Sequence, residues 1–152
     1  MLNETVKNPS QEIYESFSAD DTYELGLRFG KEAAPGSVYT LEGDLGAGKT
    51  VFAKGFAKGL GIDEHVTSPT FTIMQIYEGG RIPLYHYDAY RLDDPYEMEE
   101  IGYTEYFYGD GACLIEWACN IEEFLPEHRT VISVERDNDK GFDYRKITVT
   151  KI

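Results

Sequence analysis

The feature that most constrains the fold is the stretch YTLEGDLGAGKTVFAKGF, which occupies residues 39–56. An apolar run leads into a glycine-rich loop, and a pattern typical of a helix follows at once. The loop has the spacing Gly-x4-Gly-Lys-Thr, from Gly43 to Thr50. Between a strand and a helix, this spacing is the signature of a P-loop, whose backbone N–H groups surround the phosphates of a nucleotide. We therefore predict an α/β domain built around a phosphate-binding loop.

The side chains at the end of the loop have expected roles in nucleotide chemistry. The helix N-terminus favours an anion, Lys49 would reach the β- and γ-phosphates, and the Thr50 hydroxyl would occupy a magnesium position. Lys49 is therefore also a catalytic candidate. The residues predicted to bind ATP or ADP are Gly43, Asp44, Leu45, Gly46, Ala47, Gly48, Lys49, Thr50 and Val51.

The rest of the chain predicts a mixed sheet with helices on it. β-branched and aromatic runs indicate strands, and apolar residues at helical spacing with capping residues indicate helices. We expect one domain over 1–152, with central parallel strands, antiparallel edge hairpins and flanking helices. The expected strands are 11–17, 38–43, 71–78, 81–90, 112–117, 130–137 and 142–152, and the expected helices are 18–33, 49–60 and 94 to at least 101.

Finer details are also predicted for three of these elements. In helix 18–33, Ser18 is the expected N-cap with Asp21 as its partner, and the expected buried residues are Leu25, Leu27 and Phe29. Gly79–Gly80 predicts a two-residue connection between strands 71–78 and 81–90. In the helix from 94, Asp94 is the expected N-cap and Pro95 the first helical residue.

The tetrad FAKG occurs twice in tandem in the helix expected at 49–60. A four-residue repeat places like side chains on one face of a helix. The repeat predicts a core stripe, a basic stripe and a shallow groove, formed respectively by Phe52, Phe56 and Leu60, by Lys54 and Lys58, and by Gly55 and Gly59. We expect the groove to allow close helix–sheet packing rather than to bind a partner.

Hydrolysis or transfer of a phosphate needs a carboxylate opposite the loop, and two acids follow apolar runs. Asp88 follows PLYHY and Glu116 follows CLI. We assign Glu116 to magnesium, and Asp88 to the positioning of water or to the metal shell. Both are therefore catalytic candidates, and the predicted metal ligands are Thr50 and Glu116.

Two further features have open interpretations. The stretch TSPT, Thr67–Thr70, suits either a segment that senses the γ-phosphate or an ordinary loop before a strand. Trp117, the only tryptophan, could stack on a partner, lie near the nucleotide or pack in the interior.

The charge balance limits the partners that the chain can bind directly. It carries 28 acidic and 14 basic side chains, a net charge of −14. Contacts with phosphate backbones need clustered Lys and Arg, so this balance opposes direct binding of nucleic acid. We expect any role near RNA to pass through a protein partner. The three scattered histidines, without HExxH or CxxC, give no support to a zinc site.

The expected location is the cytoplasm. No run of about 18 apolar residues indicates a membrane helix, and the first residues lack the pattern of a signal peptide. We expect the two cysteines, Cys113 and Cys119, to be reduced thiols rather than a disulfide.

Several P-loop classes are disfavoured by missing motifs. The chain has neither [NT]KxD nor DxxG, so a Ras-like GTPase is disfavoured, and it lacks the adjacent Asp–Glu pair of oligomeric motor ATPases. A small-molecule kinase stays open, with Asp88 as base and Arg91 as phosphate clamp. A nucleotide-binding adaptor that does not hydrolyse ATP is the other alternative.

Four blocks carry a resemblance to a known family. LEGDLGAGKT, TSPTFTI, YHYDAYRL and LIEW, in this order and spacing, resemble the TsaE (YjeE) family of small bacterial ATPases in tRNA threonylcarbamoyladenosine biosynthesis. The resemblance extends from about residue 18 to the end of the chain. One position departs from it, because the family often has a second threonine where this chain has Val51.

This resemblance implies a function and assigns residues to it. It implies binding of ATP or ADP with Mg²⁺, slow hydrolysis by the isolated protein, and docking on the TsaB–TsaD pair, in which TsaD transfers threonylcarbamoyl to adenosine 37 of tRNA. By the same resemblance, residues Gly43 to Thr50 bind the phosphates, Thr50 and Glu116 hold magnesium, and Asp88 is needed for activity. The protein would then be a nucleotide-dependent switch that meets tRNA only through its partners.

Overall fold

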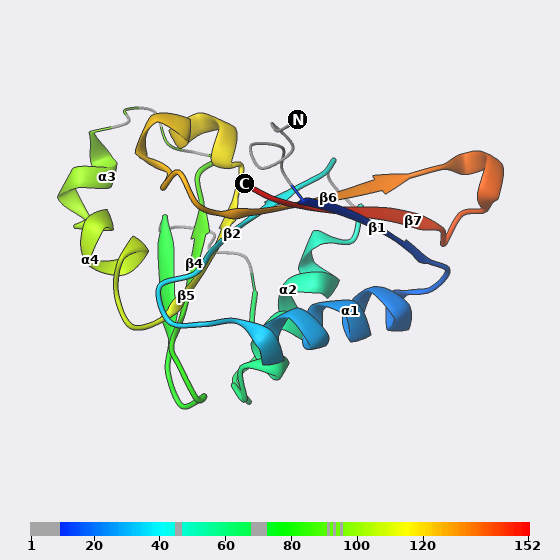
Figure 1. Cartoon of the computed structure of the whole chain (residues 1–152), viewed down its shortest axis with the longest axis horizontal. Coiled ribbons are helices and arrows are strands. Elements are labelled where there is room, and N and C mark those ends of the chain that lie inside the picture. The colour runs from blue at the N-terminus through cyan, green and yellow to red at the C-terminus, as the bar shows by residue number, and fades with distance from the viewer. Residues whose placement is uncertain (1–9, 45–46, 68–72, 91, 93, 95) are drawn as a thin grey trace, which may run out of the picture.

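The computed structural model contains one seven-stranded sheet with helices on both faces (Figure 1). The structure describes residues 10–44, 47–67, 73–90, 92, 94 and 96–152. Its strands are β1 (Ser10–Ser16), β2 (Val38–Glu42), β3 (Met74–Tyr77), β4 (Leu84–Asp88), β5 (Ala112–Glu116), β6 (Thr130–Arg136) and β7 (Arg145–Lys151). Its α-helices are α1 (Ala19–Glu32), α2 (Lys49–Gly59), α3 (Glu97–Glu100) and α4 (Tyr103–Phe107), and 3₁₀ turns occupy Ala118–Phe124 and Asn138–Lys140.

The strand order is β1-β7-β6-β2-β5-β4-β3. The central strands β6, β2, β5 and β4 are parallel to one another, whereas β1 and β7, β6 and β7, and β3 and β4 pair antiparallel. The prediction of a parallel centre with antiparallel edge hairpins is therefore confirmed. The strand that feeds the predicted P-loop, β2, lies in the middle of the sheet, where pairing on both edges holds its end firmly.

Side chains alternate between two cores because successive residues of a strand face opposite sides of the sheet. On one side, α1 and α2 cover a core that contains Leu41, Leu114 and the predicted stripe of Phe52, Phe56 and Leu60. On the other side, α3, α4 and the turn at Ala118–Phe124 cover a second core around Tyr87 and Ile115. The core stripe predicted for α2 is thus confirmed.

The glycines of the FAKG repeat face a second helix rather than the sheet, so the prediction of helix–sheet packing was wrong. A Cβ on Gly55 would lie 2.1 Å from the carbonyl oxygen of Tyr23 in α1. A Cβ on Gly59 would lie 2.2 Å from that of Leu27 and 2.8 Å from the Cα of Gly30. The two helix backbones are therefore in direct contact, which only residues without a side chain permit.

This contact also changes which face of α1 is buried. Gly26 and Gly30 are buried with Phe29, whereas Leu25 and Leu27 are only half-buried. The expected burial of the two leucines was therefore only partly right. Apolarity predicted the wrong residues because glycines, not leucines, form the point of closest approach.

The predicted N-cap of α1 is confirmed. The Ser18 side chain accepts a hydrogen bond from the Asp21 amide at 3.1 Å. The Asp21 carboxylate bonds the amide of Phe17 at 3.0 Å rather than that of Ser18, one residue earlier than in a regular capping box.

Two local boundaries differ from those predicted. The connection between β3 and β4 spans residues 78–83 rather than Gly79–Gly80 alone, because Arg81 donates its amide to the Leu60 carbonyl at 2.8 Å and ties the connection to the end of α2. The expected helix from residue 94 is two short helices, because Gly102 has a φ of 68° between α3 and α4. The N-cap of α3 is Tyr96 and not the predicted Asp94, whose carboxylate accepts a hydrogen bond from the Tyr96 amide at 3.0 Å. Pro95 lies outside the described residues.

No helix in the described part of the chain is long and apolar enough to cross a membrane. Cys113 is buried in β5 and Cys119 is exposed, and both are free thiols, as predicted.

Candidate nucleotide-binding site

The predicted phosphate-binding loop lies between β2, which ends at Glu42, and α2, which begins at Lys49. The strand–loop–helix arrangement predicted for this stretch is therefore present. Leu45 and Gly46 lie outside the described residues. The other predicted nucleotide-binding residues are in place at the start of α2 or just before it: Gly43, Asp44, Ala47, Gly48, Lys49, Thr50 and Val51.

Two glycines of the loop have backbone requirements that other residues would not meet. Gly48, which caps α2, has a φ of 108°, in the left-handed region that side chains disfavour. A Cβ on Gly43 would lie 2.6 Å from the carbonyl oxygen of Val134 in β6. The glycine spacing of the motif therefore follows from the shape of this loop as well as from its expected ligand.

Arg145, at the start of β7, holds the loop from the side. Its Nε donates to the carbonyl oxygen of Ala47 at 2.7 Å, and its Nη1 donates to those of Phe142 and Tyr144 at 2.9 and 2.7 Å. Sequence reasoning missed this residue, because nothing local in the sequence relates Arg145 to a loop almost one hundred residues earlier. The contact gives the loop a support that does not depend on a ligand.

The loop lysine faces the tryptophan that follows β5. Lys49 is 7% exposed, and its Nζ lies 4.8 Å from the centre of the Trp117 ring, a cation–π distance. Trp117 has a φ of 58°, and its ring lies 4.8 Å from that of Tyr90. Trp117 lies beside the lysine that is predicted to bind the phosphates and is also half-buried against the second core, which agrees with both the nucleotide-side and the interior interpretation.

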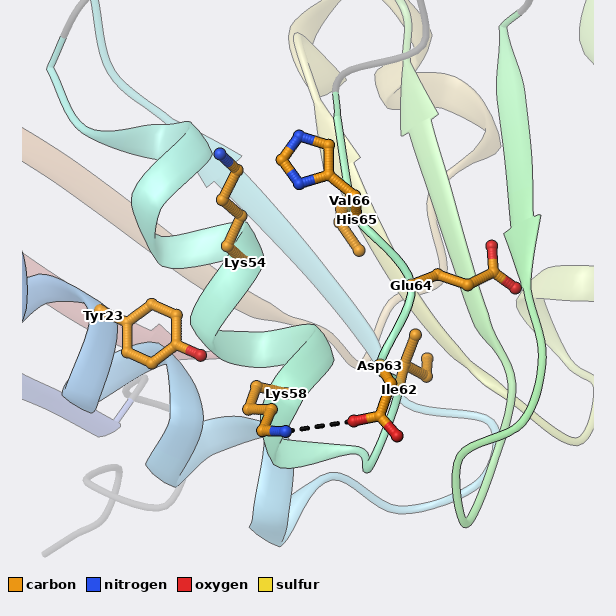
Figure 2. Close-up of a pocket in the computed structure, with 8 residues that line it drawn as sticks. All are labelled: Tyr23, Lys54, Lys58, Ile62, Asp63, Glu64, His65 and Val66. Carbon is orange, nitrogen blue, oxygen red and sulfur yellow. Dashed lines mark hydrogen bonds and ion pairs between the residues drawn. The ribbon is translucent and has the colours of Figure 1, made fainter.

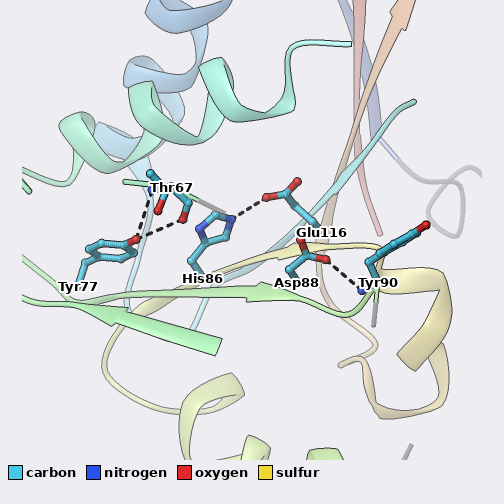
Figure 3. A network of polar contacts seen from close by, with 6 residues as sticks. All are labelled: Thr67, Tyr77, His86, Asp88, Tyr90 and Glu116. Atoms are coloured by element: carbon cyan, nitrogen blue, oxygen red, sulfur yellow. Dashed lines mark hydrogen bonds and ion pairs between the residues drawn. The ribbon is translucent and has the colours of Figure 1, made fainter. Parts of the chain in front are cut away.

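The two predicted carboxylates lie on adjacent parallel strands. Asp88 ends β4, Glu116 ends β5, and the two are paired in the register of the sheet. Both face the α1 and α2 side, because they alternate with Tyr87 and Ile115 of the opposite core. Figure 3 shows the two side chains next to each other. The two acids that the sequence indicated therefore lie together at the carboxyl ends of β4 and β5.

Burial differs between the two acids. Glu116 is 4% exposed, whereas Asp88 is half-buried and accepts a hydrogen bond from the Tyr90 amide at 3.0 Å. Burial raises the pKa of the Asp88 carboxyl above its ordinary value, the bond from Tyr90 opposes this rise, and the Glu116 carboxylate adds to it. Asp88 is thus more basic than a free aspartate, which suits a group that orients water or accepts a proton.

A buried histidine contacts Glu116 and was not predicted. The Nε2 atom of His86, in β4, lies 2.8 Å from Oε2 of Glu116, with both side chains buried (Figure 3). The signal for it was present in the sequence, since His86 stands two residues before Asp88 and must face the same side of the sheet. A single histidine in an apolar strand was not enough to indicate the pairing.

Oxygen donors suited to Mg²⁺ come from α2 and from the strand ends. Thr50 is exposed at the second residue of α2, and Glu116 and Asp88 supply carboxylates. Within the described ranges, no group of three or more His, Cys, Asp and Glu side chains is arranged to hold a metal ion. In nucleotide sites, Mg²⁺ is usually bound by one or two carboxylates together with phosphate oxygens. The donors therefore fit a magnesium ion shared with a nucleotide.

A cavity of about 170 Å³ adjoins the loop. It lies between α1, the start of α2 and the end of the β6–β7 hairpin, and its lining includes Thr22, Gly48, Val51, Asp143 and Arg145. Pockets that enclose a whole drug-sized ligand measure roughly 300–1,000 Å³, so this cavity could hold only part of a nucleotide.

A larger pocket, of about 260 Å³, lies between α1, α2 and the segment that follows α2 (Figure 2). The predicted basic stripe of Lys54 and Lys58 lines it, and Lys58 is paired with Asp63 at 3.1 Å. Neither the loop residues nor the strand-end carboxylates are among the residues that line this pocket, so it is separate from the candidate nucleotide site.

Only the first residue of the TSPT stretch is described. The Tyr77 hydroxyl donates to the Thr67 carbonyl at 3.3 Å and accepts from its amide at 3.4 Å (Figure 3). Residues 68–70 lie outside the described residues, as does Arg91, the phosphate clamp of the kinase alternative. Neither prediction is tested here.

Known proteins are similar to this chain in sequence and in architecture. The family model for "Threonylcarbamoyl adenosine biosynthesis protein TsaE" matches residues 16–147. The tRNA threonylcarbamoyladenosine biosynthesis protein TsaE of Bacillus subtilis (strain 168) is 57% identical over 120 residues, which are 79% of this chain and 73% of that protein. The protein of the same name from Treponema pallidum is 48% identical over 134 residues, which are 88% of this chain and 96% of that protein.

A solved structure agrees with these relatives. The crystal structure of Bacillus subtilis YdiB matches with a TM-score of 0.79 and 44% identity, over 95% of this chain and 87% of that one. The fold is therefore that of a P-loop NTPase-like α/β protein, and the resemblance inferred from four sequence blocks is confirmed. The chain belongs to the TsaE family of tRNA threonylcarbamoyladenosine biosynthesis proteins.

Proposed function

We propose that this protein binds Mg·ATP in the loop at residues 43–51 and hydrolyses it slowly, as a nucleotide-dependent switch. In this proposal it assists the TsaB–TsaD complex in threonylcarbamoyl transfer to adenosine 37 of tRNA. One observation carries the proposal: Lys49, at the start of α2, and the carboxylates of Asp88 and Glu116, at the ends of β4 and β5, come together on one face of the sheet. The Lys49 ammonium lies 4.8 Å from the centre of the ring of Trp117, the residue that directly follows Glu116.

Each loop residue would have a distinct role in binding. The amides at the start of α2 and the positive end of its dipole would receive the phosphates. Lys49 would leave the face of Trp117 and place its ammonium against the β- and γ-phosphates, because a full charge attracts it more strongly than a ring quadrupole does. In this proposal, the phosphates of the nucleotide thus replace the Trp117 ring as the partner of buried Lys49.

The two carboxylates would have different roles, one in binding Mg²⁺ and the other in orienting water. Thr50 and Glu116 would hold Mg²⁺ together with phosphate oxygens, and the ion would neutralise charge that develops on them. Asp88, whose pKa is raised by burial, would orient the attacking water and take up its proton. The half-buried position of Asp88 leaves it accessible to water, whereas Glu116 is covered.

The small cavity beside the loop supports a place for the adenine base of the nucleotide. Gly48 and Val51 belong both to the proposed phosphate site and to the lining of this cavity. An adenine ring held there would contact α1 near Thr22.

The charge of the chain supports an indirect role at tRNA. With a net charge of −14, the surface would repel a phosphate backbone, so the proposed contact with tRNA passes through the partner proteins. A small domain with one loop and two carboxylates suits a regulator of a larger enzyme, and the proposed cytoplasmic location follows from that role.

The test is phosphate release from ATP by the pure protein, alone and with TsaB–TsaD added. Lys49→Ala should reduce hydrolysis about 100-fold, because it removes a charge that stabilises the transition state. Lys54→Ala is the matched control, since it removes a lysine from the same helix outside the proposed site. Asp88→Asn keeps an acceptor for the Tyr90 amide and should reduce turnover more than nucleotide affinity.

The outcomes separate the three candidate functions. Stimulation by TsaB–TsaD that Lys49→Ala abolishes and Lys54→Ala keeps would support the switch. ATP that stays bound and intact with the partners would favour an adaptor. Phosphate that appears on an added small molecule rather than in solution would favour a kinase.

A further inference from the structure

His86 is buried on the face of the sheet that carries the proposed site. It is 1% exposed, and in β4 it stands between Leu84, in the core beneath α1 and α2, and Asp88 on the same face. The register pairs His86 with Leu114 and Asp88 with Glu116. The Glu116 side chain therefore reaches back by two strand positions to meet the imidazole, a diagonal contact that long side chains can make.

The bond between the two side chains has a defined direction. Nε2 of His86 lies 2.8 Å from Oε2 of Glu116. With Glu116 ionised, as its proposed role at the cation requires, its carboxylate can only accept, and Nε2 of His86 is then the donor. Holding one carboxylate oxygen also orients the other, because the two share a plane. The imidazole thus helps to fix the orientation of the Glu116 carboxylate.

Packing alone does not explain a histidine at this position. Among the described residues, Nδ1 of His86 has no hydrogen-bond partner although it is buried. An unsatisfied buried nitrogen is unfavourable, and a leucine like its neighbours Leu84 and Leu114 would avoid it. The buried hydroxyl of Tyr87 also has no partner within these residues, but it lies on the opposite face, away from the carboxylates. What distinguishes His86 among the described residues is its bond to Glu116.

We infer that His86 is a positioning residue, which orients the Glu116 carboxylate toward the divalent cation of a bound nucleotide. The inference rests on the proposed function, in which Glu116 holds that cation. Hydrogen-bonded partners of metal ligands commonly change metal affinity by about 10- to 100-fold when they are removed. His86 would act through Glu116 and would not contact the nucleotide.

The test measures binding of Mn²⁺, a probe for Mg²⁺, to the protein–ADP complex by the paramagnetic resonance signal of the free ion. His86→Leu should weaken Mn²⁺ binding about 10-fold, while ADP affinity in the presence of a chelator stays as in wild type. His86→Gln keeps an amide donor within reach of Glu116 and should restore most of the Mn²⁺ affinity. Tyr87→Phe is the matched control, because it removes a buried polar atom from the same strand on the other face.

A double substitution distinguishes positioning from a general loss of stability. In a Glu116→Gln background, His86→Leu should weaken Mn²⁺ binding no further, because the group that it orients is already lost. Thermal unfolding of each variant would show that the proteins compared are folded.

Three results would overturn the inference: His86→Leu binds Mn²⁺ as wild type does, His86→Gln is as weak as His86→Leu, or the two losses add in the double variant. A wild-type protein that binds neither ADP nor ATP would instead refute the proposed function, and the inference with it.

Discussion

The backbone contact between α1 and α2 makes a prediction whose sign can be worked out from the structure. Gly55→Ala adds one methyl group in the middle of α2. Alanine is the better helix former by about 1 kcal/mol, so propensity alone would stabilise the variant. The added Cβ would, however, lie 2.1 Å from the carbonyl oxygen of Tyr23, whereas ordinary contacts begin at 3.4 Å. Propensity and packing therefore oppose each other at this position.

Packing should dominate because neither partner can move alone. The oxygen belongs to the backbone of α1, and Gly26 and Gly30 are in equally close contact with α2. Relief of the clash requires the helices to separate by about 1 Å, which opens the core beneath them. Overpacking of this kind costs about 1–3 kcal/mol. With a cost near the upper limit and the gain in propensity subtracted, we expect a net loss of about 2 kcal/mol.

Urea unfolding followed by circular dichroism measures this loss. The midpoint should fall by about 1 M at unchanged slope, given slopes of about 1–3 kcal/mol/M for small proteins. ADP affinity should fall as well, because Lys49 and Thr50 begin the same helix and move with it. Glu24→Ala, at an exposed position of α1, is the matched control and should stay within about 0.5 kcal/mol of wild type. A midpoint of Gly55→Ala at or above that of wild type would refute the backbone contact.

Three further predictions concern a buried thiol and the arginine beside the loop. Burial raises the pKa of Cys113 to about 12. A thiol reagent near neutral pH should therefore label only Cys119 in the native chain and both cysteines after denaturation. Two labelled thiols in the native protein would contradict the structure. The pKa of Cys113 is higher in the folded than in the unfolded chain. Its contribution to stability is therefore present below pH about 9 and should be lost as the pH rises toward about 12. Measurements of the free energy of unfolding at graded pH would show this loss. Arg145→Ala and Arg145→Lys should both weaken ADP binding about 10-fold, because lysine lacks the guanidinium that bonds several carbonyls at once. Calorimetry measures the affinity, and a wild-type value for Arg145→Lys would mean that the positive charge alone suffices.

The features that could be predicted from the sequence are those with a local signal. The loop between β2 and α2 was predicted because its glycine spacing is contiguous, and the core stripe of Phe52 and Phe56 because the repeat matches the helical period. The acids at the ends of β4 and β5 were predicted because each follows an apolar run. In these cases the residues that decide the structure lie within one element.

The features that were missed depend on pairing between distant segments. The bond from Arg145 to Ala47 joins β7 to the loop, and the bond from His86 to Glu116 crosses from β4 to β5. The partner of Gly55 is likewise in another helix. Each contact can be predicted only when the strand order or the helix pairing is known. The hydrophobic periodicity and the composition of the sequence give neither.

The position of Arg145 links the site to the order in which the ribosome releases the chain. Strands β2, β4 and β5, with helix α2, all precede residue 117, so the loop and both carboxylates emerge early. Strand β7 follows all of these elements in the chain, and only when it emerges can β1 obtain its partner in the sheet. The same strand brings the guanidinium that holds the Ala47 carbonyl. During synthesis, the support of the predicted phosphate-binding loop and the pairing of β1 therefore arrive together, and a nascent chain lacks both until β7 is released.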